Sequence, residues 1–312
     1  MTSPPTKEGD EADEIVERAR KRTTSRRELA RNPRFEQISP DVGELDEAAV
    51  DEALADDPDD LLAMLADLTG ATDPRLRELA KRIAGRLYLD IARRGPPKPR
   101  GTGRLAELPY RPDRGDLDLD ASLETIAVAR AAGEAVDPDR LRVRAWSTPA
   151  TAICLLVDRS GSMQGRPLAT SAVAAAAVAW RAPSDYSVLS FGKDVIAAKS
   201  QDHARPVDQV VDAVLALRGF GTTDLAGALR SAREQLARSP AGRRITVLLS
   251  DCRATEPGDV VGAAALLDEL VIVAPDGDSD EAEALAARVG ARLVTVAGPA
   301  SVADALGRAL DE

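Results

Sequence analysis

The chain has 312 residues, of which 44% are hydrophobic, only 3% aromatic and 30% charged. This length accommodates about two domains, with cores built from alanine, valine and leucine. Acidic residues outnumber basic ones by 52 to 41, and the formal net charge of −11 argues against nucleic acids and anionic membranes as partners.

The composition also predicts where the protein resides. No stretch approaches the roughly 20 apolar residues of a membrane span, and the polar start, residues 1–10, lacks the apolar core of a signal peptide. The two cysteines, Cys154 and Cys252, cannot build a disulfide framework. We therefore expect a cytoplasmic protein with free thiols and no membrane insertion.

The N-terminal part divides into two regions. Residues 1–44 are charged and poor in apolar side chains, which predicts a flexible tail. Apolar residues then recur at helical spacing, and Asp57-Pro58 and Asp73-Pro74 are typical helix starts. The sequence predicts a small helical region over residues 45–94, with helices at residues 45–54, 59–68 and 74–91.

A third region, residues 95–147, begins with a basic stretch rich in glycine and proline. Because Tyr110 is the only aromatic residue near that stretch, stacking on nucleic acid bases is not expected. The stretch is either a solvated linker or a docking strip for an acidic partner. A helix over residues 121–132 and an alternating strand over residues 141–146 follow, and the strand is either a recognition arm or a plain edge strand.

The fourth region, residues 148–312, alternates short apolar runs with longer helical patterns. Such alternation predicts an α/β fold with a doubly wound, mostly parallel sheet. Residues 186–192 alternate between polar and apolar, which predicts a strand exposed on one side. The other expected strands are 153–157, 194–198, 245–251, 270–274 and 293–296, and the expected helices are 171–180, 207–217, 225–236, 280–289 and 300–310.

Oxygen-bearing side chains follow the first of these buried strands. Asp158 ends the apolar run 153–157, and Ser160 and Ser162 place two hydroxyls at alternate positions of the next turn. Carboxylate and hydroxyl oxygens suit Mg²⁺ or Mn²⁺ and suit zinc or copper poorly. The motif therefore predicts a site for a hard divalent cation.

Two later segments offer the same kind of donor. A glycine loop carries Thr222 and Thr223 just before a helical stretch, and Asp251 ends the strand that begins at residue 245. Because parallel strands end at one edge of a sheet, these segments can meet despite their separation in sequence. We predict one metal site made by Asp158, Ser160, Ser162, Thr223 and Asp251, and the choice of Thr223 over its neighbour Thr222 rests on the family resemblance described next.

At these residues the chain resembles the von Willebrand factor A (VWA) family. The run from Asp158 to Ser162 matches the family pattern Asp-x-Ser-x-Ser, Thr223 with Asp224 matches its Gly-Thr-Asp/Asn loop, and Asp251 matches its second-strand aspartate. The resemblance implies a metal-ion-dependent adhesion site with Mg²⁺, or else Mn²⁺ or Ca²⁺. It also implies that the two serines and Thr223 ligate directly while the two aspartates act through bound waters.

The resemblance further implies an open metal position that a carboxylate of a partner protein fills. Arg159 and Gln164 are candidates for contacts with that partner, and a solvated surface is their other interpretation. Many relatives have glycine where this chain has Cys252. That difference leaves the ligands intact but can alter how closely a partner backbone approaches.

The order of segments upstream of the metal motif resembles bacterial CoxE-like VWA proteins. Relatives of this kind resemble partners of MoxR-type AAA+ ATPases, including the VWA-bearing subunit of magnesium chelatase. This implies an adaptor that works with such an ATPase in remodelling a client protein or inserting metal into it. The chain contains no Gly-x-x-x-x-Gly-Lys-Ser/Thr loop, so ATP hydrolysis would belong to the partner.

Two other functions fit the same residues. In a metal-dependent hydrolase or phosphatase, Ser160 or Ser162 would be the nucleophile, but no histidine or lysine base lies near the motif in sequence. In a scaffold with a structural metal, the cation would raise the melting temperature without affecting partner binding. We expect the chain not to be an enzyme.

Overall fold

The computed structural model describes residues 5–94, 104–110, 116–133, 135–147, 150–159, 165–217 and 221–311. The chain folds into two units. The main unit comprises Met1–Pro97 and Thr151–Glu312, and the inserted unit comprises Lys98–Ala150.

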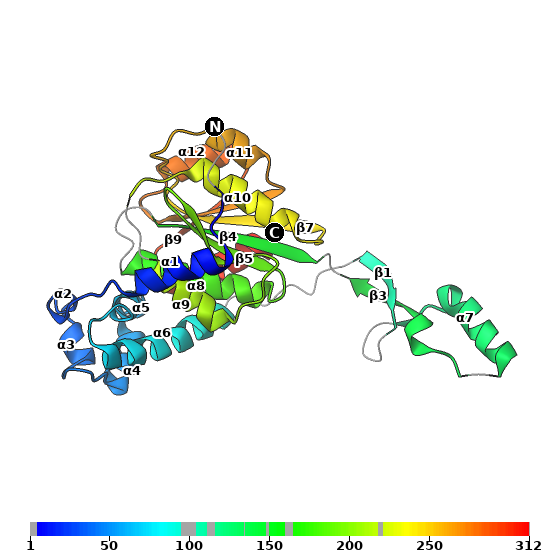
Figure 1. Ribbon diagram of the computed structural model, residues 1–312, viewed down its shortest axis with the longest axis horizontal. Coiled ribbons are helices and arrows are strands. Elements are labelled where there is room, and N and C mark those ends of the chain that lie inside the picture. The colour runs from blue at the N-terminus through cyan, green and yellow to red at the C-terminus, as the bar shows by residue number, and fades with distance from the viewer. Residues whose placement is uncertain are drawn as a thin grey trace. The chain divides into compact units, whose positions relative to one another are not determined.

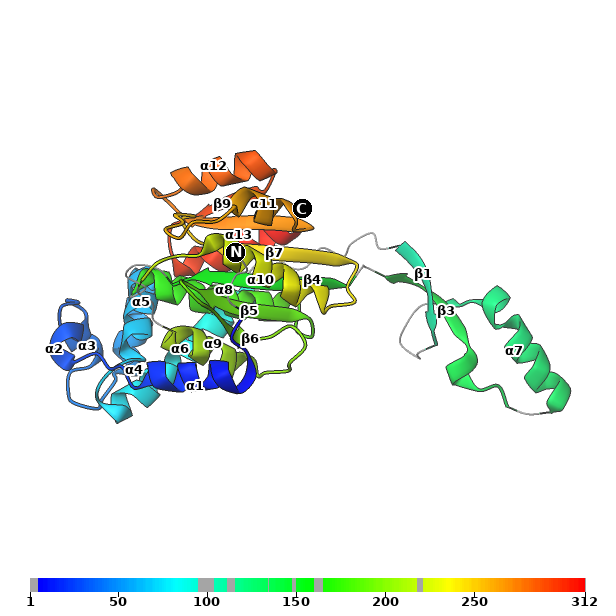
Figure 2. The ribbon, with the colours of Figure 1, turned by 45° about the horizontal axis from the view of Figure 1, so that its top comes forward.

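The main unit is built on a six-stranded sheet of order β6-β5-β4-β7-β8-β9, which can be followed in Figure 2. All neighbouring strands are parallel except β5 and β6, which form an antiparallel hairpin. The strands are β4 (Thr151–Asp158), β5 (Tyr186–Phe191), β6 (Val195–Lys199), β7 (Arg243–Leu249), β8 (Glu269–Pro275) and β9 (Arg292–Val296). The predicted α/β fold with a mostly parallel sheet is confirmed.

Both faces of the sheet are covered, because the central strands are apolar on both sides. In β4, Ile153 and Leu155 contribute to one core cluster, whereas Cys154 and Leu156 contribute to the other. The first cluster packs against α8 (Arg166–Arg181), α9 (Val207–Ala216) and α13 (Pro299–Asp311). The second packs against α10 (Leu225–Ala237), α11 (Val260–Ala265) and α12 (Asp280–Val289).

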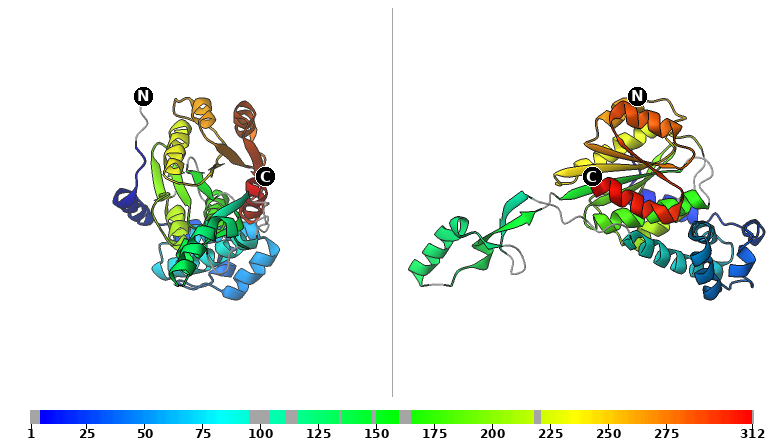
Figure 3. Two further views of the ribbon diagram at one scale, coloured as in Figure 1. Left: turned by 90° about the vertical axis from the view of Figure 1, so that its right-hand side faces the viewer. Right: turned by 180° about the vertical axis from the view of Figure 1, so that it is seen from behind.

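The helices expected in the second region form a further layer over α8 and α13. They are α4 (Glu47–Asp56), α5 (Pro58–Leu68) and α6 (Pro74–Arg94), which lie below the sheet near α8 in Figure 1. Both α5 and α6 pack against α8 and α13. Helix α8 is therefore covered on two sides, which explains why alanine fills most of its buried positions. The right-hand view of Figure 3 shows α13, in red, beside α8.

The described part of the region 1–44 is largely helical, whereas its charge led us to expect a flexible tail. Residues 5–44 contain the helices α1 (Gly9–Arg20), α2 (Arg26–Leu29) and α3 (Phe35–Ile38). Their few apolar side chains are well spaced, and Val16, Phe35 and Ile38 are all buried. The backbone of Lys7 also pairs with the edge strand β6, donating to Val195 O at 2.9 Å and accepting from Ala197 N at 2.9 Å.

Two further details of the sheet differ from the sequence expectations. Strand β5 is buried along its whole length, so the prediction of one exposed side was wrong. Its polar residues, Ser187 and Ser190, are small enough to pack beneath the helices, and neither is more than 1% exposed. The short helix α11 was not predicted, because six residues give too little pattern.

The inserted unit contains a three-stranded antiparallel sheet of order β1-β3-β2. Its elements are β1 (Arg104–Pro109), β2 (Asp116–Leu117), α7 (Leu119–Ala132), a 3₁₀ turn (Pro138–Arg140) and β3 (Arg142–Ser147). The carboxylate of Asp118 accepts from Ala121 N at 3.1 Å and pairs with Arg144 at 2.8 Å, so it starts α7 and ties it to β3. The hydrogen bond from Ala121 N and the charge of Arg144 lower the pKa of Asp118.

Residues 95–103, the core of the expected basic linker, lie outside the described residues. The described part of the chain contains no helix with the length and apolar character that a bilayer crossing needs.

Candidate functional site

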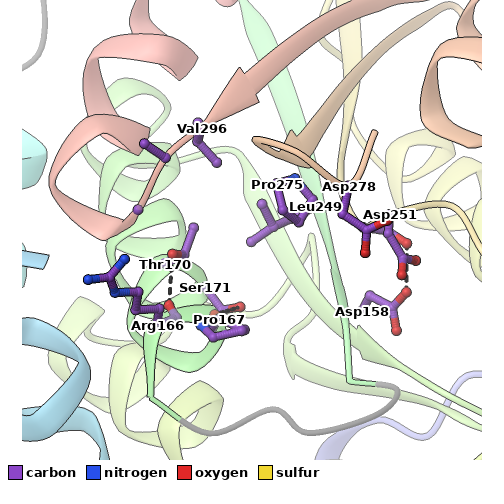
Figure 4. A pocket seen from close by; sticks show the side chains of 13 residues that line it. Asp158, Arg166, Pro167, Thr170, Ser171, Leu249, Asp251, Pro275, Asp278 and Val296 are labelled. Atoms are coloured by element: carbon purple, nitrogen blue, oxygen red, sulfur yellow. Dashed lines mark hydrogen bonds between the residues drawn. The ribbon is translucent and has the colours of Figure 1, made fainter. Parts of the chain in front are cut away.

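The carboxyl ends of β4 and β7 bring two of the predicted acidic residues to one edge of the sheet. Val157 pairs with Leu249, so Asp158 at the end of β4 lies opposite Ser250. The Ser250 hydroxyl donates to Asp158 Oδ2 at 2.6 Å. Asp251 follows directly, and Figure 4 shows its side chain next to that of Asp158.

The two carboxylates differ in exposure. Asp158 is 7% exposed, whereas Asp251 is half-buried and accepts a hydrogen bond from Arg253 N at 3.0 Å. The Ser250 hydroxyl, besides donating to Asp158, accepts from Cys252 N at 2.9 Å. Ser250 therefore fixes both the Asp158 side chain and the backbone that follows Asp251.

Thr223 is fixed to the loop that follows Asp251. Its backbone N–H donates to Thr255 Oγ1 at 2.7 Å, and its carbonyl accepts from Thr255 N at 3.2 Å and Glu256 N at 3.1 Å. The neighbouring Asp224 N donates to Gly192 O at 2.8 Å, which ties the same loop to the end of β5. The glycine loop, the end of β5 and the loop after β7 are thus joined by backbone hydrogen bonds.

The two threonines of the glycine loop lie in different environments. Thr222 is exposed to solvent, whereas Thr223 is 1% exposed. The Thr223 hydroxyl is also buried without a hydrogen-bond partner among the described residues. A buried hydroxyl left unpaired costs about 1–3 kcal/mol, so the position favours a ligand that accepts its lone pair.

The described donors fit a hard cation that uses hydroxyl ligands. Asp158, Thr223 and Asp251 lie at one edge of the sheet, and all three offer oxygen. Ser160 and Ser162 lie outside the described residues, as does Gln164. The described residues contain no cluster of three or more His, Cys, Asp or Glu side chains able to hold a metal, so a cation here would depend on the hydroxyls.

Arg159 is directed toward the β5–β6 turn. Its backbone N–H donates to Phe191 O at 2.9 Å, and its guanidinium donates to Asp194 O at 3.4 Å. The side chain is half-buried, and this burial lowers the pKa of Arg159. These contacts tie the end of β4 to the β5–β6 turn.

Cys252 occupies a backbone conformation that favours glycine. Its φ of 65° is the only positive value among non-glycine residues that the structure describes. The residue is 8% exposed, and burial raises the pKa of its thiol to about 12. The thiol therefore stays protonated near neutral pH, where it packs as a small apolar side chain. Cys154 is also a free, buried thiol.

A cavity of about 380 Å³ opens beside the carboxylates, between the start of α8 and the ends of β7, β8 and β9 (Figure 4). Leu249, Pro275 and Val296 give it an apolar lining. Asp158 and Asp251 lie on one side of it, and Arg166 lies on the other.

Helix α5 holds two of the loops around this cavity. The Asp67 carboxylate accepts from Gly165 N at 2.9 Å, where the loop after β4 enters α8. The Asp59 carboxylate accepts from Ala300 N at 2.8 Å, at the start of α13. A Cβ at Gly298 would lie 2.4 Å from Asp59 Oδ2, so any larger residue there would displace the carboxylate that caps α13. The N-terminal helical region is thus part of the support for the site.

Several residues of the site were not predicted from the sequence. Ser250 could have been found, because it directly precedes Asp251 at the end of a buried strand. Thr255, Asp59 and Asp67 carry no local signal, because each contacts the backbone of a segment that is distant in sequence.

A family model described as VWA domain containing CoxE-like protein matches residues 98–275. Among curated proteins, no significant match was found.

Solved structures with a similar chain path include proximal thread matrix protein 1 from the mussel byssus, with 13% identity, a TM-score of 0.39, and coverage of 52% of this chain and 47% of that chain. A von Willebrand factor type A protein from Catenulispora acidiphila has 15% identity, a TM-score of 0.42, and coverage of 54% and 43%. The manganese-loaded TRAP protein of Plasmodium vivax has 16% identity, a TM-score of 0.37, and coverage of 47% and 68%. The chain spans less than half the length of the first two of these structures.

Proposed function

The chain belongs to the family of CoxE-like proteins that contain a VWA domain, and on that premise we propose that it is a metal-dependent adaptor that binds a carboxylate of a partner protein. VWA-type domains commonly mediate protein interactions. In this proposal Ser160, Ser162 and Thr223 hold Mg²⁺ through their hydroxyls. Asp158 and Asp251 would act on the ion through bound waters.

The observation that carries the proposal is the buried Thr223 hydroxyl, which has no hydrogen-bond partner among the described residues. It lies at the edge of the sheet where the Asp158 and Asp251 carboxylates also end. When bound, Mg²⁺ would supply an open coordination position for a hard oxygen ligand. The chain's own residues hold the donors in place, through Ser250 on Asp158 and Thr255 on Thr223.

We further propose that the chain works with a MoxR-type AAA+ ATPase. Together the two proteins would remodel a client protein or insert metal into it. The family membership supports this idea. The sequence contains no phosphate-binding Gly-x-x-x-x-Gly-Lys-Ser/Thr loop, so an adaptor role leaves ATP hydrolysis to the partner.

The test is an affinity capture from native lysate with the full chain, in Mg²⁺ and in EDTA. Thr223→Val removes the ligand hydroxyl at nearly constant volume, and Thr222→Val is the matched control on the exposed neighbour. We expect wild type and Thr222→Val to retain the same ATPase in Mg²⁺, and EDTA or Thr223→Val to release it. Retention of the same proteins by all samples would contradict the metal-dependent contact. Phosphatase activity of the Mg²⁺-loaded chain that Thr223→Val abolishes would favour a hydrolase instead.

A further inference from the structure

The cavity beside the carboxylates has more room than the metal site uses. Its volume of about 380 Å³ lies in the range of pockets that bind ligands. A metal held by the predicted donors would lie at one end, near Asp158 and Asp251, and the rest of the cavity extends toward α8 and α13.

The middle of the cavity favours an apolar group. Leu249, Pro275 and Val296 line it with carbon. The hydroxyls of Thr170 and Ser171, on the α8 wall, donate to the backbone carbonyls of Arg166 and Pro167, each at 2.8 Å. Because these hydroxyls are already paired within the helix, they do not require a polar occupant.

The two ends of the cavity differ in charge. Asp278, beside Asp251, is paired with Arg253, so that charge is already compensated. At the other end, Arg166 is exposed and has no ion pair with any residue that the structure describes. An acidic group would therefore find a charge partner at either end, at the bound cation or at Arg166.

We infer that this cavity receives a short partner segment with two acidic side chains and an apolar side chain between them. One carboxylate binds the metal, the apolar side chain enters the space lined by Leu249, Pro275 and Val296, and the second carboxylate pairs with Arg166. The inference rests on the proposed metal-dependent binding and adds a sequence preference to it.

The preference can be measured with a positional-scanning array of capped pentapeptides that have Asp or Glu at the centre and Ala, Leu or Glu elsewhere. The array is read with the labelled full chain in Mg²⁺ and in EDTA. We expect leucine at one flanking position to strengthen Mg²⁺-dependent binding about tenfold over alanine, as burial of one such side chain predicts. A second acidic residue beyond the leucine should raise the affinity by about a further threefold, a small gain because an ion pair with the exposed Arg166 is screened by solvent.

Two variants separate the cavity from the metal. Ala297→Phe fills the cavity from an exposed lining position, and Ala254→Phe adds the same bulk close to Asp251 but outside the cavity. We expect Ala297→Phe to abolish the leucine preference and Ala254→Phe to keep it. Arg166→Gln should remove the gain from the second acid, whereas Arg288→Gln, an exposed arginine on α12, should not. Mn²⁺ binding, followed by electron paramagnetic resonance, should be the same in all four variants.

The outcomes distinguish the two ideas. If wild type binds no acidic peptide in Mg²⁺, the proposed function itself fails. If it binds acidic peptides with no preference for a flanking leucine, or if Ala297→Phe and Ala254→Phe weaken binding equally, the metal contact stands and the cavity inference is overturned.

Discussion

Thr223 and Thr246 form a natural pair for testing the metal site. Both side chains are buried, and both carry a hydroxyl without a hydrogen-bond partner among the described residues. Thr246 lies inside β7, away from its carboxyl end, whereas Thr223 lies beside the loop that follows Asp251. The two positions therefore differ in whether a cation can use the hydroxyl.

We predict that Thr223→Val lowers the metal affinity without lowering the stability of the metal-free fold. Removing an unpaired buried hydroxyl stabilises the chain in EDTA by about 1 kcal/mol, and the increase in melting temperature that Mg²⁺ gives to wild type disappears. Thermal unfolding in EDTA and in Mg²⁺ measures both effects. Thr246→Val should be as stable in EDTA and should keep its response to Mg²⁺. Equal responses of the two variants would argue against Thr223 as a ligand.

Glu269 gives a prediction about pH. Its carboxylate accepts from Arg243 at 2.7 and 2.8 Å and from Arg292 at 3.1 Å, so it ties β7, β8 and β9 together. The hydrogen bonds from Arg243, and then the charges of both arginines, lower the pKa of Glu269 from its usual 4.5. A lowered native pKa adds stability above pH 4.5 that is lost as the pH falls through the native pKa.

Glu269→Gln should therefore destabilise the chain by about 1 kcal/mol at pH 7, and its difference from wild type should shrink as the pH falls below 4.5. Urea unfolding at several pH values measures this difference. Asp268→Asn, an exposed neighbour with the same change of charge, should stay within about 0.5 kcal/mol of wild type at each pH. A difference that persists at low pH would mean that packing, not charge, accounts for it.

Helix α5 carries two aspartates, and we expect one of them to affect metal binding and the other to affect only the stability of the fold. Asp59 accepts from Ala300 N and so caps the start of α13, and Asp67 accepts from Gly165 N at the end of the loop that follows β4. Gly165 has φ 61° and ψ −124°, a conformation accessible essentially to glycine alone. The Asp67 contact thus stabilises an unusual turn close to the predicted serine ligands.

We predict that Asp67→Ala weakens Mg²⁺ binding about tenfold although Asp67 is not a ligand, since outer contacts orient ligands. Asp59→Ala, on the same helix, should lower the stability by about 1 kcal/mol through the lost cap and leave the metal affinity unchanged. Isothermal titration with Mg²⁺ and thermal unfolding distinguish the two effects. An unchanged Mg²⁺ affinity of Asp67→Ala would mean that the predicted serine ligands do not depend on the contact between Asp67 and Gly165.

The strands and helices of the main unit could be predicted from the sequence, but the burial of β5 and the contacts made by α5 could not. The helix expected at residues 280–289 forms as α12, and the apolar runs before Asp158 and Asp251 form β4 and β7. The alternating sequence of β5 led to a wrong prediction of one exposed side, because Ser187 and Ser190 are polar yet buried beneath helices. The α5 contacts could not be predicted, because a side chain that accepts from a distant backbone N–H leaves no periodic signal.

At the scale of the whole molecule, the inserted unit has its own sheet and its own helix. Helix α7 leaves Leu119 and Leu123 64% exposed and Val128 60% exposed, so it contributes little to any core among the described residues. The main unit, in contrast, contains both faces of the six-stranded sheet and the helices that cover them.

We predict that the main unit folds without the inserted unit. Replacing residues 98–150 by a flexible glycine-serine linker should shift the melting temperature by only a few degrees, on the order of 1 kcal/mol, and leave Mn²⁺ binding intact. Thermal unfolding and electron paramagnetic resonance test this, with the full chain as the reference. Loss of cooperative unfolding would show that residues 98–150 are needed for the main fold.

The layer formed by α5 and α6 also has a consequence for how the chain is made. These helices bury their apolar faces against α8 and α13, and the end of α13 is tied to α8 by the pair Arg181 and Asp311 at 2.7 Å. During synthesis α5 and α6 leave the ribosome well before either partner, with the whole inserted unit emerging in between. Until α8 and α13 have been synthesised, the apolar faces of α5 and α6 that these helices later cover are exposed to water or bound by a chaperone. The nascent chain is most prone to aggregate in that interval.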